Sequence, residues 1–187
     1  MSSRTLTLWI GLGVALFWSV GAYKRMVRLR AEVRRAFAAL DTRLIEQLAL
    51  LQSHLPASMH ASLLTQPGEL LDDISRLWIG LRSAAAQLAA SLAAARAHPL
   101  DARALGALAA ARSVLDTTWQ RMPLAQADPA GTLLPESVQR QWEQGGAHAY
   151  AAVDQFNQAV TRYNAAVGQF PAVLLAWVCG FKAARAL

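Results

Sequence analysis

The stretch LTLWIGLGVALFWSVGAY, residues 6–23, runs directly into KRMVRLRAEVRRAFAALDTRLIEQLALLQSHL, residues 24–55, and together these parts decide the fold. The first part carries no charge, and at about 1.5 Å per residue it gives about 27 Å of helix, just enough for a bilayer core. Trp9, Trp18 and Tyr23 lie toward its ends, where amphipathic rings favour the membrane interface. The sequence therefore predicts a short tail over 1–5 and a single transmembrane helix over 6–23.

A block of basic residues follows the predicted span and sets its predicted orientation. Its members are Lys24, Arg25, Arg28, Arg30, Arg34 and Arg35. Because Lys and Arg beside a span stay in the cytoplasm, the block predicts an N-terminus outside and a cytoplasmic body at a bacterial inner membrane. Each basic residue would gain about 1 kcal/mol near anionic headgroups. A cleaved signal peptide, with Arg4 as its basic start and Val20-Gly21-Ala22 as its cleavage site, is the alternative.

Apolar side chains recur at helical spacing after the basic block begins. They are Met26, Leu29, Val33, Phe37, Leu40, Leu44, Leu48, Leu51 and Leu55. Their steps of three and four residues repeat about every 11 residues, the period of a nearly straight helix with one apolar stripe. Span and stripe thus predict one continuous helix, whose second part, about 24–55, begins the soluble domain.

The remaining chain is predicted to form three more helices and a short apolar segment. Loops rich in Pro, Gly and Asp separate periodic segments at about 69–98, 101–122 and 136–169. A tight link with Asp101 as N-cap predicts that the helices on its two sides form an antiparallel hairpin. The predicted fold is therefore all-α: one transmembrane helix continuing into an elongated antiparallel four-helix bundle over 24–187. The segment 172–182 is too short to span a bilayer and is expected to cap the bundle or lie in the interface.

The last long helix contains a repeat, FNQAV at 156–160 and YNAAV at 163–167. The period of seven places Phe156, Tyr163 and Phe170 on one ridge, with Asn157 and Asn164 one position beyond it. One interpretation is a polar ladder that binds a partner. The other is that the two Asn side chains fix the register of the helix by hydrogen bonds to its neighbours. These five residues are therefore the candidate site for bundle register or for interaction with a partner.

Two blocks at opposite ends of the chain resemble the LemA family. The first is YKRMVRLR at 23–30, directly after the span, with Val33, Ala36, Phe37 and Leu40-Asp41. The second is the Asn repeat followed by Phe170-Pro171, Ala176 and Gly180-Phe181-Lys182. The resemblance implies a membrane-anchored, elongated antiparallel helical bundle and no particular reaction. The sequence departs from the family where Phe37 replaces Trp and where 183–187 replace an aromatic and acidic ending.

The sequence contains no recognisable catalytic, cofactor or metal motif. One cysteine excludes an internal disulfide and a multi-Cys zinc site. The net charge is +6, but the basic block has no interleaved aromatic residues, so nucleic acid is not an expected partner. We therefore expect a non-enzymatic interaction or scaffold protein without cofactors, whose partners are the bilayer and other proteins; the sequence leaves a homo-oligomer open. The alternative is an extracytoplasmic helical sensor or ligand-binding domain that signals through the span.

Overall fold

The computed structural model describes residues 3–54, 73–125, 136–170 and 172–187, without the side chains of 3–8, 10–12, 15, 73–75 and 123–125. The described residues form helices and no strand, so the all-α prediction is confirmed for them. The helices are α1 (Ser3–His54), α3 (Asp73–Ala97), α4 (Ala102–Ala125), α5 (Glu136–Gly168) and α6 (Ala172–Val178).

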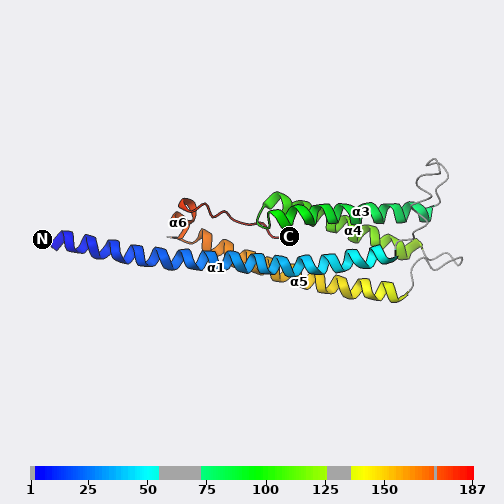
Figure 1. The fold of residues 1–187 in the computed structure, drawn as a ribbon, viewed down its shortest axis with the longest axis horizontal. Helices are drawn as coiled ribbons and strands as arrows, with labels where there is room; N and C mark the ends of the chain where they lie inside the picture. Colours follow the sequence, from blue (N-terminus) through cyan, green and yellow to red (C-terminus); the bar gives the residue numbers. More distant parts are fainter. Residues whose placement is uncertain (1–2, 55–72, 126–135, 171) are drawn as a thin grey trace.

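Four long helices lie side by side and alternate in direction along an elongated molecule (Figure 1). The closest packing is between α1 and α5 and between α3 and α4. The short helix α6 contacts α5 and α1. The N-terminal part of α1 extends beyond the ends of the other helices (Figure 1). The molecule is therefore two helix pairs with one projecting arm.

The apolar stripe of α1 forms the core of the first pair. Every stripe residue from Met26 to Leu51 is buried, as predicted, and Leu55 lies outside the described residues. α5 contributes buried side chains with the same helical spacing, among them Phe156 and Val160. Phe37 of α1 meets Phe156 edge to face, with ring centroids 6.0 Å apart. One continuous stripe thus fixes which face of α5 turns inward.

Side chains join the two helix pairs. Trp119 of α4 stacks on Trp142 of α5, with ring centroids 4.3 Å apart. Arg96 of α3 donates from Nε to Oδ1 of Asp41 on α1 at 2.7 Å. Leu81, Leu88 and Leu92 of α3 and Leu105, Leu108 and Leu115 of α4 are buried in the shared core. The bundle is therefore a single packed body and not two independent helix pairs.

The link between α3 and α4 has the predicted form. The backbone N–H of Asp101 donates to the carbonyl of His98 at 3.0 Å and closes a tight turn. Oδ1 of Asp101 accepts from the backbone N–H of Arg103 at 3.0 Å, as an N-cap does. The short turn makes α3 and α4 antiparallel neighbours.

Helix ends differ from the prediction in two places. α4 continues through Pro123 to Ala125, whereas the sequence predicted a loop from Pro123 onward. A proline in the last turn removes one hydrogen bond near an end that frays in any case. α5 ends at Gly168, and Phe170, predicted on its apolar ridge, is 77% exposed because residues 169 and 170 have left the helix. The predicted helix start at 69–72 lies outside the described residues.

In the described part of the chain, no helix is both long and apolar enough to cross a membrane. The span predicted over 6–23 therefore has no support from the described residues, and its side chains at 6–8, 10–12 and 15 lie outside them.

The stripe can be tested by placing a charge on it. Leu44 is 1% exposed, whereas its neighbour Ile45 is 44% exposed. We expect Leu44→Asp to lower the free energy of unfolding by about 3 kcal/mol or more, because it buries an unpaired carboxylate. The matched control Ile45→Asp should change it by less than about 1 kcal/mol. Urea unfolding of the full chain in detergent measures both, and equal losses would show that Leu44 does not face the core.

Candidate functional site

Asn157 and Asn164 bind the backbone of the tail, which we define as residues 181–187. Asn164 donates from Nδ2 to the carbonyl of Ala184 at 2.8 Å and accepts at Oδ1 from its N–H at 2.9 Å. Asn157 makes the same two bonds with Leu187, at 3.0 and 2.8 Å. Each side-chain amide thus pairs with both backbone groups of one tail residue. The partners of the two Asn side chains are therefore the tail, and not a neighbouring helix.

The spacing of the two helical residues matches that of the two tail residues. Seven residues of α-helix rise about 10.5 Å. Three residues of fully extended chain cover about 10 Å. Ala184 and Leu187 can therefore meet successive Asn side chains only if the tail is nearly straight, and Figure 1 draws it as an extended trace. Since the higher-numbered tail residue meets the lower-numbered Asn, the tail runs antiparallel to α5.

Phe156 and Tyr163 support the Asn pair from inside the bundle. Both are buried, so these members of the predicted ridge are core residues. The hydroxyl of Tyr163 donates to the carbonyl of Lys182 at 3.0 Å and adds a third anchor for the tail. Burial raises the pKa of Tyr163, and the positive charge of Arg30 opposes that rise in part. The neutral phenol that the hydrogen bond requires is therefore the favoured form.

Few side chains of the tail contribute to its contacts with the bundle. Ala184 is buried and Leu187 is half-buried, whereas Lys182, Ala183, Arg185 and Ala186 are exposed. A Cβ placed on Gly106 of α4 would lie only 3.2 Å from the guanidinium of Arg185, and Leu187 lines a cavity with Leu108 of α4, so side chains of the tail reach α4. The tail thus lies between α5 and α4, and backbone hydrogen bonds contribute most of its polar contacts.

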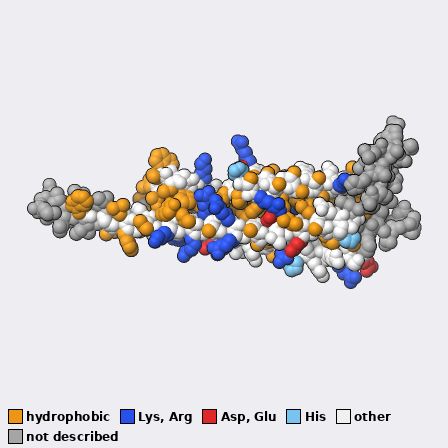
Figure 2. All heavy atoms as spheres, in the orientation of Figure 1, with side chains coloured by type: hydrophobic (Ala, Val, Ile, Leu, Met, Phe, Trp, Pro, Cys, Tyr) orange, Lys and Arg blue, Asp and Glu red, His pale blue; other side chains and the backbone are white. Residues whose placement is uncertain are grey.

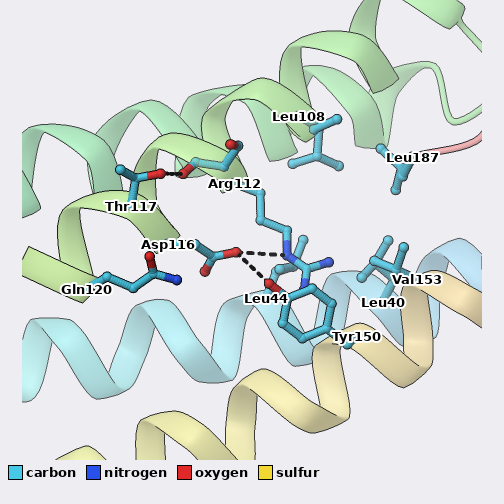
Figure 3. Close-up of a pocket in the computed structure, with 12 residues that line it drawn as sticks. Leu40, Leu44, Leu108, Arg112, Asp116, Thr117, Gln120, Tyr150, Val153 and Leu187 are labelled. Atoms are coloured by element: carbon cyan, nitrogen blue, oxygen red, sulfur yellow. Dashed lines mark hydrogen bonds and ion pairs between the residues drawn. The ribbon is translucent and has the colours of Figure 1, made fainter.

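A cavity of about 410 Å³ adjoins Leu187, the last residue of the tail as defined above. Its walls come from α1, α4 and α5, and Figure 3 places Leu187 at one edge beside Leu40, Leu108 and Val153. Tyr150 donates from its hydroxyl to Asp116 at 3.1 Å and lies under the Arg112 guanidinium, 4.2 Å from the ring centroid. Arg112 also pairs with Asp116 at 3.8 Å, so the charges of the polar wall cancel. The cavity suits an uncharged, largely apolar group.

The six residues of the basic block are all exposed on α1. Arg28 pairs weakly with Glu32, at 4.0 Å. Arg30 lies over the ring of Phe181, 5.8 Å from its centroid, and Tyr23 meets the same ring edge to face at 6.0 Å. Arg30 of the block therefore adjoins the start of the tail, which the sequence did not predict.

Sequence reasoning missed the tail and the cavity. Arg112, Asp116 and Leu108 lie on α4, and Leu40 and Leu44 lie on α1, so no local motif joins them. The sequence did contain one signal that pointed to the cavity. Tyr150 lies seven residues before Asn157, as Asn157 lies seven before Asn164, so the three share one face of α5. Extending the Asn repeat backward by one period would have found the cavity.

The described residues contain no group of three His, Cys, Asp or Glu side chains placed to hold a metal ion. Comparisons of the chain with protein-family models, with curated proteins and with solved structures find no match. The resemblance to the LemA family therefore stays a prediction from the quoted residues.

The pKa of Tyr163 gives a testable pH dependence. An unfolded Tyr ionises near pH 10, whereas the folded form holds its proton to higher pH. The unfolded state therefore loses the proton first, and the stability that Tyr163 contributes, complete below about pH 10, declines as pH rises further. We expect Tyr163→Phe to cost about 1 kcal/mol at pH 8 through one lost hydrogen bond, and to flatten the decline above pH 10. Urea unfolding from pH 8 to 11 measures this, and parallel curves for the two proteins would contradict it.

Proposed function

We propose that this chain is a membrane-anchored, non-enzymatic helical-bundle protein that acts as an interaction or scaffold protein at the cytoplasmic face of a bacterial inner membrane. The observation that carries the proposal is an apolar surface at one end of the molecule. We define this apolar end as the outer face of α6 together with Phe17, Val20 and Tyr23 of α1. The LemA resemblance implies the same class of protein.

The outer face of α6 is apolar although it packs against no described helix. Ala176 is buried against the bundle, whereas Leu174, Trp177 and Val178 are exposed, Trp177 by 84%. Phe170, just before α6, is exposed as well. Hydrophobic side chains gather over α6 and the neighbouring part of α1 (Figure 2). A contiguous exposed apolar surface of this kind is typical of a protein or membrane contact.

The basic block favours the membrane over a protein as the contact. Its cationic side chains lie on α1 directly after the apolar arm, and Lys and Arg side chains adjoin the apolar surface in Figure 2. Apolar rings beside a cationic border match the chemistry of acyl chains beside anionic headgroups. In the proposed arrangement, residues 6–23 enter the bilayer, α6 lies in the interface, and the rest of the bundle stands in the cytoplasm.

The position of α6 can be measured through Cys179, the single cysteine of the chain, which is exposed at the end of α6. We expect a fluorophore on Cys179 to be strongly quenched by headgroup-region spin-labelled lipids when the full chain is reconstituted into vesicles containing anionic lipid. The control Cys179→Ser with Gln120→Cys carries the same label on an exposed site of α4, and should be quenched little. Equal quenching at the two sites would refute membrane contact by α6.

The orientation needs a separate test in cells. A reporter that is active only in the cytoplasm, fused after Leu187, should be active, and one active only outside should be silent. The opposite result would contradict the cytoplasmic body and favour the extracytoplasmic sensor. With a cytoplasmic result, crosslinking in cells would identify the proteins that the bundle contacts.

A further inference from the structure

We propose that the face of α5 carrying Tyr150, Asn157 and Asn164 is a binding groove for an extended segment of a partner polypeptide. The chain's own tail, residues 181–187, is the resident occupant of part of that groove. The inference rests on the proposed interaction role and names the chemistry of the partner. It does not depend on membrane attachment.

The groove recognises polypeptide backbone and not a particular side chain. Four hydrogen bonds join the Asn157 and Asn164 amides to the N–H and carbonyl groups of Leu187 and Ala184. The hydroxyl of Tyr163 donates to the carbonyl of Lys182. A segment that repeats the three-residue spacing of the tail offers these groups in the same places, except one with proline at either N–H. In such complexes backbone bonds provide affinity, and side-chain pockets provide specificity.

The resident tail occupies only part of the groove. It meets the Asn164 and Asn157 positions, three residues apart, and its last contact is Leu187. A longer segment in the same register would place a side chain three residues further on, opposite Tyr150. There the cavity of about 410 Å³ lies open, within the range of about 300–1,000 Å³ typical of ligand pockets.

The lining of the groove defines the partner. The position opposite Asn164 holds the buried Ala184 and accepts a small residue. The position opposite Asn157 holds Leu187 and accepts an aliphatic residue. The cavity opposite Tyr150 is lined by Leu40, Leu44 and Leu108. The charges of Arg112 and Asp116 in its wall are paired. This cavity therefore accepts a second aliphatic residue. The partner segment is therefore extended, runs antiparallel to α5, and reads small-x-x-aliphatic-x-x-aliphatic.

The test first removes the resident tail. In the full chain, Ala184→Pro with Leu187→Pro deletes both tail N–H donors, which should release the tail while leaving the helices unchanged. The probe is a fluorescent peptide that repeats residues 181–187 and continues with Ala-Ala-Leu. By anisotropy in detergent, we expect it to bind the double-proline protein at least about tenfold more tightly than the wild-type chain, whose tethered tail competes. A probe without Ala-Ala-Leu should bind about tenfold more weakly, as expected for one unburied aliphatic side chain.

Matched controls distinguish recognition of the peptide backbone from nonspecific binding. Adding Asn157→Ala and Asn164→Ala to the double-proline protein should abolish binding, whereas adding Gln158→Ala, an exposed neighbour bonded to Asp154, should not. A probe N-methylated at the two amides that face the Asn side chains should also fail to bind, and this control leaves the protein unaltered. Binding that survives N-methylation, or no binding to the double-proline protein, would overturn the proposal.

Three further outcomes show which of the two proposals fails. If the wild-type chain forms dimers that the double-proline protein cannot form, the occupant is the tail of a second copy and the partner assignment is wrong. If labelled Cys179 is quenched by lipid but no peptide binds, the groove inference fails while the proposed membrane role stands. Peptide binding without lipid contact would support the groove and refute membrane contact by α6.

Discussion

The packing of α5 against the apolar stripe of α1 determines where the two Asn side chains and α6 lie. The stripe begins at Met26 and packs against α5, with Phe156 and Tyr163 buried inside the bundle. Asn157 and Asn164, one position further around α5, are thereby held half-buried at the edge of the core. An Asn side chain at such an edge keeps its rotamer but retains free hydrogen-bonding groups, and these receive the tail.

The same constraint places α6 beside the N-terminal part of α1. The part of α1 before the stripe is mostly exposed where its side chains are described. α6 returns to that part of α1, and Phe181 lies between Tyr23 and Arg30. Apolar and cationic side chains from sequence positions far apart thus meet at one end of an elongated body. Separating the membrane contact from the peptide groove along the bundle axis would let one molecule use both.

The sequence predicted the parts of the fold that depend on periodicity. The stripe from Met26 to Leu51 and the capped turn at Asp101 follow from local spacing and capping chemistry, and both are present. Pro123 and Phe170 misled the prediction, because a helix end is set by tertiary contacts as well as by its residues. The Asn repeat pointed to the right positions but not to their partner. The tail carries no periodic pattern, and hydrogen bonds to its backbone leave no trace in its side chains.

Amide hydrogen exchange in the tail, followed residue by residue by NMR on the full chain in micelles, shows whether the two Asn side chains hold the tail backbone. The N–H groups of Ala184 and Leu187 donate to Asn164 and Asn157. In the described part of the chain, those of Ala183 and Ala186 have no partner and serve as internal controls. We expect exchange at 184 and 187 to be slowed at least about tenfold relative to 183 and 186, because exchange then requires release of the tail. Four equal exchange rates would contradict the claim that the Asn pair binds an extended backbone.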